Sequence, residues 1–481
     1  MDILHCSFEC YPAAKVGGLA DVAGALPKYL NQVNLSTALI MPKHDTPWLN
    51  QASFAVDYAG SFRWYYGDVG FRVLRETTGT LGFPLYVVEL NDLFLRRGIY
   101  MRENGYPYHD EPERYIAFQL AVLNWVKQFQ TKPKLIHVHD HHCGLIPLFM
   151  QCGPEFHALR SIPTVFTIHN GLYQGAFSWD KKYLLPYLPS QVYGLLDWNE
   201  AINPMACAVK CAQAVTTVSK GYLQELMQFA NGLETLFQKE HQKCFGIING
   251  IDGEVWSPDR DRYIDHLLEG SLSREFKKAN KESLCRDYGF KFEKPLFIFI
   301  GRLVHEKGAD LIPDAINKLL QQTEVYMLLL GSGSADIEQV LRLCSVKHSA
   351  HVKYAQGYNE PLSHRMYASA DFLIMPSRIE PCGLNQLYAM HYGTIPIVND
   401  IGGLRDSVTD LTDASPRGIK IKNATVDELY NGLKRAVSLF QNPELLDSIS
   451  IENMQIDFSW NEAIKPYLAI YEYLTKSKTM I

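Results

Sequence analysis

The chain has 481 residues, more than one hydrophobic core usually organises, so we expect two domains of roughly 200 to 250 residues. Its 46 basic and 52 acidic residues leave a net charge of -6, which gives no bulk electrostatic reason to bind nucleic acid or an anionic membrane. No apolar run reaches the roughly 18 residues of a membrane-spanning helix, Asp2 and Glu9 interrupt any signal-peptide core, and the cysteines lack CxxC pairs, so we expect a soluble, cytoplasmic protein with reduced thiols.

Short apolar runs rich in β-branched residues recur along the chain, separated by amphipathic stretches. These runs are residues 2–8, 36–42, 85–90, 134–140, 164–169, 214–219, 244–249, 296–301, 325–331, 371–376 and 395–400. The pattern predicts parallel strands buried on both faces, and therefore an α/β protein. Because ligands gather at the carboxyl ends of such strands, the polar residues that end these runs are the candidates for chemistry. The polar stretch 249–276 separates two groups of runs, so we expect two doubly wound domains facing across a cleft.

The first candidate is the loop "AKVGGLADV", residues 14–22, between the first strand and a helix. Gly17 and Gly18 allow the backbone to approach a ligand, and the following helix presents unpaired N–H groups that suit phosphate. The loop matches neither GxGxxG nor a P-loop, so its spacing alone does not separate a phosphate cradle from a tight turn. The letters GGL recur at 402–404, again before a helical stretch.

The stretch "HVHDHHC", residues 137–143, has several residue types that bind metals. Strand alternation puts His137 and His139 on one face, with Asp140 at the strand end. A metal would still need ligands from elsewhere in the chain, so we favour a structural interpretation.

The polar connector contains a second metal-like pattern. Asp259 and Asp261 form the DxD pattern that metal-dependent sugar transferases use to hold a divalent ion. These residues do not lie at a strand end, and we interpret the match as chance.

The loop "GRLVHEKGADL", residues 301–311, follows a buried strand. Arg302 offers a fork-shaped cation and Lys307 a point charge, and both can bind one polyanion. Their place at the carboxyl end of a strand favours anion binding over two solvated surface charges.

The stretch 375–398, "MPSRIEPCGLNQLYAMHYGTIPIV", places Glu380 between a strand end and a helix. A carboxylate there can stabilise positive charge on a substrate or cap the helix. The local pattern alone favours the helix cap.

Taken together, these stretches resemble the bacterial glycogen synthase and plant starch synthase family, which are retaining glucosyltransferases of the GT-B fold. The resemblance is carried in order by "KVGGLADVAGALPKYL", "HVHDHHCGLIP", "TIHNGLYQGAF", "AVTTVSKGYLQEL", "IINGIDGEVWSP", "GRLVHEKGADL", "GYNEPLSHRMYASADFLIMPSRIEPCGLNQLYAMHYGTIPIV" and "GGLRDSV". It implies two Rossmann-like domains, an acceptor-side domain of residues 1–245 and a donor-side domain of residues 246–459. It also implies that a last helix, 460–481, packs back on the first domain.

The resemblance also implies roles for individual residues. Lys15 matches the lysine of the K-x-G-G-L motif that contacts the sugar-nucleotide donor, and Glu380 matches the essential glutamate. The donor-binding positions implied are Lys15, Gly18, Asp21, Arg302, Lys307, Tyr358, Cys382, Gly383 and Leu384, with Tyr358 stacking on the base. The catalytic positions implied are Glu380, His169, Arg302 and Lys307, and the positions implied for the sugar and acceptor side are Glu9, Asp140 and Asn170.

For the reaction, the resemblance implies transfer of glucose, with ADP-glucose as the expected donor and a glycogen or α-1,4-glucan acceptor. A front-face mechanism is implied, and no metal is then required because cations and a helix dipole stabilise the leaving diphosphate. The chain departs from the family at Ala206, where most members have a lysine, and the segment 50–115 matches poorly. These departures concern acceptor preference.

Three other functions fit parts of the sequence. The first is a related GT-B transferase that uses UDP-glucose or a different acceptor. UDP-glucose stays open as the donor because a tyrosine stacks on adenine or uracil alike. A metal hydrolase would be built on "HVHDHHC", and a glucan-binding protein would have lost catalysis. The presence of Glu380, Arg302 and Lys307 argues against the last function.

Overall fold

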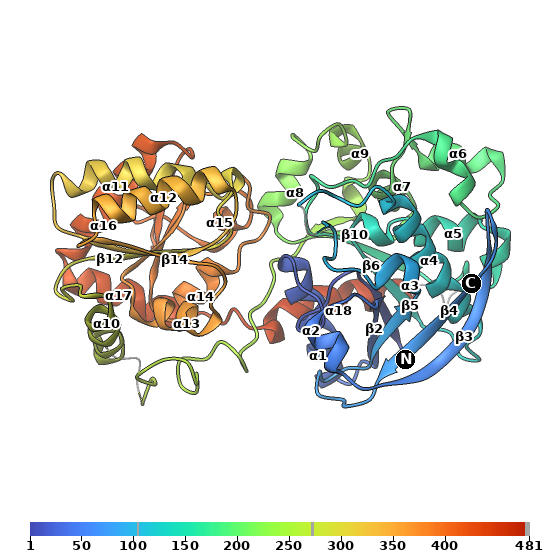
Figure 1. Cartoon of the computed structure of the whole chain (residues 1–481), viewed down its shortest axis with the longest axis horizontal. Helices are drawn as coiled ribbons and strands as arrows, with labels where there is room; N and C mark the ends of the chain where they lie inside the picture. Colours follow the sequence, from blue (N-terminus) through green and yellow to red (C-terminus); the bar gives the residue numbers. More distant parts are fainter. Residues whose placement is uncertain (103–104, 271–273, 477–481) are drawn as a thin grey trace. The chain divides into compact units, whose positions relative to one another are not determined.

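A computed structural model describes residues 1–102, 105–270 and 274–476, and it divides into two compact units (Figure 1). The first unit comprises Met1–Val218, Leu223–Ile247 and the chain from Ala463 onward. The second comprises Ser219–Tyr222 and Ile248–Glu462. The chain therefore leaves the first unit, forms the second, and returns through its last helix.

The described part of the first unit is built on a nine-stranded sheet in the order β11-β10-β7-β6-β1-β2-β5-β4-β3. Its strands are β1 (Ile3–Cys6), β2 (Thr37–Pro42), β3 (Phe54–Trp64), β4 (Gly67–Glu76), β5 (Leu85–Glu89), β6 (Leu135–His139), β7 (Thr164–Ile168), β10 (Ala214–Thr217) and β11 (Cys244–Gly246). The strands from β11 to β5 pair in parallel, while β4 and β3 are antiparallel. A small separate sheet pairs β8 (Asp197–Trp198) with β9 (Ala201–Ile202).

Helices of the first unit follow most of its parallel strands. They are α1 (Gly18–Gln32), α2 (Pro47–Gln51), α3 (Asn91–Phe94), α4 (Glu111–Lys127), α5 (Ile146–Cys152), α6 (Tyr193–Leu196), α7 (Pro204–Cys211) and α9 (Glu234–Lys239). Helix α8 (Lys220–Leu226) is divided between the units, because Ser219–Tyr222 belong to the second. Helix α18 (Trp460–Lys476) begins in the second unit and continues in the first. Residues 477–481 of the helix expected at 460–481 lie outside the described residues.

The described part of the second unit is built on a six-stranded, fully parallel sheet in the order β14-β13-β12-β15-β16-β17. Its strands are β12 (Leu296–Ile300), β13 (Tyr326–Gly331), β14 (Val352–Gln356), β15 (Phe372–Met375), β16 (Ile395–Asn399) and β17 (Ile419–Ile421). Numbered within the unit, this order is 3-2-1-4-5-6, that of a doubly wound nucleotide-binding fold. The parallel strands of the first unit have the same order with one strand added, since β5-β2-β1-β6-β7-β10-β11 is 3-2-1-4-5-6-7 when they are numbered along the chain.

Two apolar cores cover the two faces of the second unit's sheet (Figure 1). Helices α11 (Ile312–Leu320), α12 (Ala335–Lys347) and α16 (Val426–Phe440) pack on one face, and α10 (Arg274–Tyr288), α13 (Glu360–Ser369) and α14 (Asn385–His391) on the other. The remaining helices are α15 (Gly402–Ser407) and α17 (Pro443–Met454). Helix α16 is typical, because Thr425 caps its first turn and Leu429, Leu433 and Ala436 face the core at helical spacing.

Each of the eleven predicted apolar runs contains a strand, which confirms the α/β class and the parallel sheets. The sequence reasoning missed the hairpin β3–β4, in which most residues of β3 are exposed or half-buried. It also missed the two edge strands of the second sheet, β14, which is mostly half-buried, and β17, which has three residues. Edge and half-exposed strands lack the continuous apolar run that marks a buried parallel strand.

Two general expectations can be compared with the structure. All ten cysteines are free thiols, and nine of them are buried. Within the described ranges, none of the helices is both long and apolar enough to span a membrane.

Candidate active site

Both units place several of their candidate residues where the strand order reverses. In the first unit this point lies between β1 and β6, and in the second between β12 and β15. Chain segments leave such neighbouring strands in opposite directions, which opens a crevice at their carboxyl ends. The loops after these four strands carry Glu9 to Gly18, Asp140, Arg302 to Lys307, and Glu380.

In the first unit a buried glutamate holds the glycine loop after β1. Glu9 Oε2 accepts hydrogen bonds from the backbone N–H of Val16 (2.5 Å) and of Gly17 (3.0 Å). The Tyr100 hydroxyl donates to Glu9 Oε1 at 2.7 Å. Burial raises the pKa of Glu9, although these donors act against the rise. Glu9 therefore shapes the loop, in addition to any contact with a sugar.

Helix α1 begins at Gly18, and no side chain caps its first N–H groups. Gly17 has an extended backbone that any residue can adopt, and a Cβ built on Gly17 or Gly18 would meet no atom within 4 Å. Neither glycine is thus required by strain or by packing against the described residues. Lys15 Nζ lies 2.6 Å from Asp21 Oδ1 beside this helix start. An uncapped helix N-terminus with open space and a neighbouring cation suits an anionic group.

Asp140, His169 and Asn170 come together at the ends of β6 and β7. Asp140 has a positive φ of 54° and its Oδ1 accepts a hydrogen bond from the His169 backbone N–H at 2.7 Å. Burial raises the pKa of Asp140 to about 7, and burial lowers that of His169 to about 3. Asn170 Oδ1 accepts from the N–H of Leu172, which closes the turn after His169. His169 Nε2 lies 3.0 Å from Nδ1 of His139.

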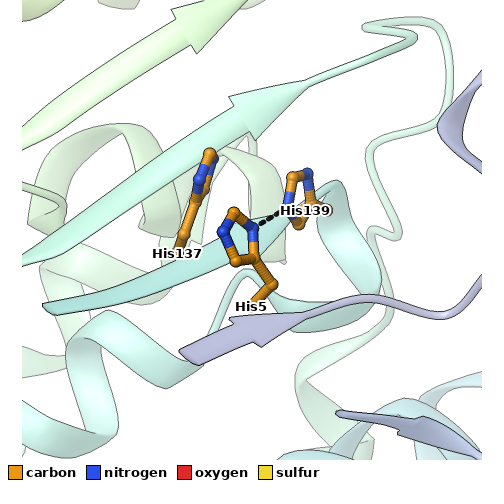
Figure 2. Close-up of side chains that lie close together, drawn as sticks. All are labelled: His5, His137 and His139. Carbon is orange, nitrogen blue, oxygen red and sulfur yellow. Dashed lines mark hydrogen bonds between the residues drawn. The ribbon is translucent and has the colours of Figure 1, made fainter. Parts of the chain in front are cut away.

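His5, His137 and His139 form a buried cluster on β1 and β6, and ligand-type nitrogens of all three lie within 4.8 Å of one another (Figure 2). The rings of His137 and His139 stack at 4.3 Å, which confirms that both face the same side of β6. His137 Nδ1 already pairs with the Tyr471 hydroxyl (2.7 Å) and its Nε2 with Thr167 Oγ1 (2.5 Å). His5 Nδ1 pairs with His139 Nε2 at 3.0 Å. Because a metal ion needs free lone pairs directed at one point, this hydrogen-bonded arrangement does not fit a metal site.

In the second unit Gly308 brings the cationic loop against the loop after β15. Gly308 has a φ of 68°, and a Cβ there would lie 2.1 Å from the Pro376 carbonyl oxygen, so only glycine fits. The Arg378 N–H donates to the Glu306 carbonyl at 2.8 Å, and the Arg378 guanidinium makes a bidentate pair with Asp310. These contacts fix the position of Lys307.

Lys307 and Glu380 form a close ion pair. Lys307 Nζ lies 2.7 Å from both carboxylate oxygens of Glu380, and Ser377 Oγ donates to Glu380 Oε2 at 2.9 Å. Glu380 is 5% exposed. The helix-cap interpretation of Glu380 is wrong, because no side chain caps α14 and the carboxylate is directed at Lys307 instead. Arg302 is largely exposed, and its nearest ion pair, with Glu306, is 3.8 Å long.

Glycine is favoured by the backbone conformation at Gly383 and is required by packing at Gly403. Gly383 has a φ of 73°, and a Cβ there would lie 2.4 Å from Gln386 Oε1. A Cβ on Gly403, in α15, would lie 2.1 Å from the carbonyl oxygen of Cys382. Cys382 is buried, which raises its pKa to about 12, and Leu384 immediately precedes α14. The structure thus brings the loop 380–384 and the start of α15 together.

Tyr358 lies after β14, and its side chain is 78% exposed. The chain turns at Gly357, which has a φ of 100°, and helix α13 follows with Asn359 as its cap. An exposed ring at a strand's carboxyl end can accept a stacked base.

Two further positions received an interpretation from sequence. Asp261 of the DxD pattern is buried, and its Oδ2 accepts from His364 Nδ1 (2.6 Å) and from the Tyr392 hydroxyl (2.5 Å). It anchors the connector to the second unit. Ala206 is fully buried in the first turn of α7, where its N–H donates to Asn203 Oδ1. A lysine there would have to lose water or find a partner.

Sequence reasoning missed Tyr100, Ser377 and His5, each of which contacts a candidate residue or its neighbour. Tyr100 comes from the segment that matched poorly, and it acts through one hydroxyl. Ser377 follows a strand end three residues before Glu380, which was an available signal. His5 lies inside an apolar strand 134 residues from His139, and only the pairing of β1 with β6 brings them together.

Comparisons with known proteins agree with this geometry. The starch synthase catalytic domain model matches residues 2–239, and the glycosyl transferases group 1 model matches residues 280–450. The glycogen synthase of Flavobacterium johnsoniae is 43% identical over 99% of this chain and 100% of its own length. That of Finegoldia magna is 33% identical over 99% and 100%.

Solved structures give the same answer. The catalytic domain of Arabidopsis thaliana starch synthase IV, bound to ADP and acarbose, matches with a TM-score of 0.87 at 29% identity, covering 98% of this chain and 99% of that one. A sucrose-phosphate synthase from Thermosynechococcus elongatus shares the fold, with a TM-score of 0.63 at 15% identity over 99% of both chains. These matches confirm the GT-B fold and a glycosyltransferase. The chain belongs to the family of bacterial glycogen synthases and plant starch synthases.

Proposed function

We propose that this chain is a hexosyltransferase that moves glucose, with retention, from ADP-glucose to the non-reducing 4-hydroxyl of an α-1,4-glucan such as glycogen. The observation that carries the proposal is the placement of Lys307 against Glu380 at the second unit's strand-order reversal. An ammonium group has three N–H donors, and two of them can serve Glu380, which leaves one for a phosphate oxygen. Arg302, on the same loop and largely exposed, supplies a second cation.

The chemistry of glucosyl transfer needs such groups. The sugar becomes oxocarbenium-like in the transition state while the leaving diphosphate gains charge. In the second unit Arg302 and Lys307 are the cations that stabilise the diphosphate. In the first unit the uncapped start of α1 and Lys15 form a second group that suits an anion. Glu380 fixes Lys307 and offers a carboxylate to the positive charge of the sugar. In a front-face reaction the leaving phosphate takes the proton of the acceptor hydroxyl.

Glu9, Asp140, His169 and Asn170 are proposed to line the sugar and acceptor side. Asp140 and His169 are buried at adjacent strand ends and are linked by a hydrogen bond, which supports a shared role. His169 is neutral at physiological pH because burial lowers its pKa to about 3, so it adds no positive charge beside the sugar.

We further propose that the reaction needs no metal ion. Cationic side chains and a helix dipole replace it at the diphosphate, and the DxD carboxylate of Asp261 is already hydrogen-bonded to His364 and Tyr392. The nine buried thiols suit a reducing compartment, which supports the cytoplasm.

The preference for adenine over uracil is supported by the relative from Arabidopsis, whose structure holds ADP. Tyr358 can stack on either base, so UDP-glucose is the alternative donor.

The test is an initial-rate assay of the purified enzyme with glycogen and labelled ADP-glucose or UDP-glucose, with and without EDTA. We expect transfer from ADP-glucose, α-1,4-linked product and no effect of EDTA. The Glu380→Gln variant should lose at least 100-fold in kcat, since one charge-assisted interaction at the reacting groups is worth about 3 kcal/mol. Faster transfer from UDP-glucose would overturn the donor, and loss of activity in EDTA would overturn the metal-free mechanism.

A further inference from the structure

Three histidines from three neighbouring strands form a continuous hydrogen-bonded chain. His5 Nδ1 lies 3.0 Å from His139 Nε2, and His139 Nδ1 lies 3.0 Å from His169 Nε2 (Figure 2 shows the first of these bonds). His5 is on β1, His139 on β6, and His169 directly follows β7. His5 and His139 are 0% exposed, and His169 is 8% exposed. The chain therefore runs from the middle of the sheet to the candidate active site.

All three rings are neutral at physiological pH. Burial lowers the pKa of His5 and of His169 to about 3, and it lowers that of His139 well below its ordinary value. A neutral imidazole has one N–H donor and one acceptor nitrogen. Because both nitrogens of His139 are used, it donates through one and accepts through the other. The two hydrogen bonds must then run in the same direction along the chain.

The inner end of the chain selects that direction. His5 Nε2 is buried and has no hydrogen-bond partner among the residues that the structure describes. If the bonds ran from His169 toward His5, this atom would carry a buried N–H without an acceptor. If they run from His5 toward His169, it carries only an unused lone pair. Buried N–H groups without a partner are the rarer and more costly case, so the bonds run outward.

His137 keeps this chain in place without joining it. Its ring stacks on His139 at 4.3 Å and lies 4.7 Å from that of His5. Its two nitrogens are occupied by the hydroxyls of Tyr471 and Thr167. His137 therefore supports the rings of His5 and His139 by contact alone, and it does not take part in the hydrogen-bonded chain of histidines.

The outer end of the chain is His169 Nδ1. With Nε2 accepting from His139, the ring proton of His169 is on Nδ1. Nδ1 makes no hydrogen bond to any residue that the structure describes. It is also absent from the fully buried polar atoms that have no partner, so it is accessible to a ligand. The other end of the residue is held by Asp140, which accepts from the His169 backbone N–H.

We propose that His5 and His139 are positioning residues that hold His169 in its Nδ1–H form, so that Nδ1 donates a hydrogen bond to an oxygen of the transferred sugar. This inference rests on the proposed function for the identity of the ligand, but not for the position of the proton. A neutral donor orients the sugar without placing a full positive charge beside an oxocarbenium-like centre.

The direct test is the ring ¹⁵N spectrum of full-length protein labelled on histidine. A spectrum of His169→Gln assigns the His169 signals by difference. We expect a protonated Nδ1 and an unprotonated Nε2 in the wild-type enzyme without substrate. Protonation of Nε2 in an active wild-type enzyme would overturn the inference and leave the proposed function intact. Absence of glucosyl transfer in the wild type would overturn the proposed function, while the tautomer would still be measured.

Three substitutions of His139 give a matched kinetic test. The amide nitrogen of His139→Asn sits near the position of Nδ1 and can donate to His169, whereas that of His139→Gln sits near Nε2 and cannot. His139→Leu removes both groups. We expect kcat to fall about tenfold in the Leu and Gln variants, with the KM for the donor changed less than threefold, and the Asn variant to retain more of the rate. Equal rates in the Asn and Leu variants would overturn the inference.

Two further measurements keep the inference falsifiable if the Leu variant does not fold. His5→Phe keeps a ring but removes the inner donor, so we expect His169 to populate both tautomers. An unchanged His169 spectrum in this variant would overturn the outward direction. Elemental analysis of the wild-type protein should find no stoichiometric transition metal. A bound metal lost on substitution of His5 would also overturn the inference, because the metal would take the nitrogens that the chain uses.

Discussion

Replacing Gly18 by alanine should separate the two interpretations of the loop before α1. The backbone at Gly18 is helical, and its added methyl group would meet no atom within 4 Å. Alanine is preferred to glycine in a helix by up to about 1 kcal/mol, and less in the first turn. We therefore expect the Gly18→Ala protein to unfold at the same temperature as the wild type or about 1 to 2 °C higher.

The same methyl group should interfere with a donor phosphate. If phosphate oxygens approach the uncapped N–H groups of α1, the methyl would lengthen or break one charge-assisted hydrogen bond, worth about 1.5 to 3 kcal/mol. The KM for the nucleotide sugar should then rise about 10-fold to 100-fold. The assay is an initial-rate series in donor concentration at saturating glycogen, beside a thermal unfolding curve.

Helix α1 also contains the matched control. A Cβ on Gly24 would lie 2.5 Å from the Tyr11 carbonyl oxygen, so Gly24→Ala should destabilise the protein by about 1 to 3 kcal/mol despite the better helix propensity of alanine. If Gly18→Ala leaves the donor KM unchanged while keeping its stability, the loop is a structural turn and the reasoning fails. It also fails if Gly18→Ala lowers the unfolding temperature as Gly24→Ala does.

Substitutions at three other places in the structure, Asp140, the Lys307–Glu380 pair and Tyr358, have defined outcomes. Asp140→Asn should become more stable relative to the wild type as pH rises from 4 to 8. In the wild type the native Asp140 keeps its proton up to its pKa of about 7, while the unfolded chain loses it near 3.8, so the wild type loses at most about 4 kcal/mol of unfolding free energy over this range. Urea unfolding at both pH values checks this, and a difference that does not change with pH would contradict it. Lys307→Met should lower the free energy of unfolding by about 3 kcal/mol, because Glu380 is left buried without its partner. Urea titrations should show that the double variant with Glu380→Gln recovers most of that loss. No recovery would mean that the broken ion pair does not cause the loss of stability. Tyr358→Ala should raise the KM for the donor about tenfold without changing the unfolding temperature, whereas Tyr358→Phe should keep the wild-type KM. Equal changes of the donor KM in both variants would exclude stacking of the donor base on the Tyr358 ring.

The buried strands of both sheets were predictable because each is a short apolar run. The strand ends were predictable for the same reason, and they located Asp140, His169 and Gly301 correctly at the carboxyl edge. The hairpin β3–β4 was not predictable in this way, since β3 is mostly exposed and its residues do not form an apolar run.

Side-chain partners were harder to predict than positions. Local sequence favoured Glu380 as a helix cap, but the carboxylate pairs with Lys307, which is 73 residues away and is brought near by a left-handed glycine, Gly308. In the same way, the sequence around His139 gives no sign of His5, because their contact depends on which strands are neighbours. Long-range pairings of this kind follow from the topology and not from local pattern.

The repeated letters GGL show why a short motif cannot decide its own role. At 17–19 the two glycines have open space around them, so the described residues do not require glycine there. At 402–404 the first glycine has a φ of 41°, and the second is in close contact with Cys382, so glycine is required there by the protein itself. The same three letters thus carry different constraints.

The two units also differ in the charge of their candidate residues. The second unit offers charged groups: Lys307 is ion-paired with Glu380, and Arg302 lies near Glu306. In the first unit burial raises the pKa of Asp140 to about 7 and keeps His169 neutral. Under the proposed function this difference matches the reaction, because the diphosphate needs opposite charge while the sugar needs orientation without added positive charge. Salt screens the attraction between the exposed Arg302 and the diphosphate, so substitutions at Arg302 should weaken donor use most strongly at low salt and less at high salt. The effect of substitutions at His169 should not depend on salt.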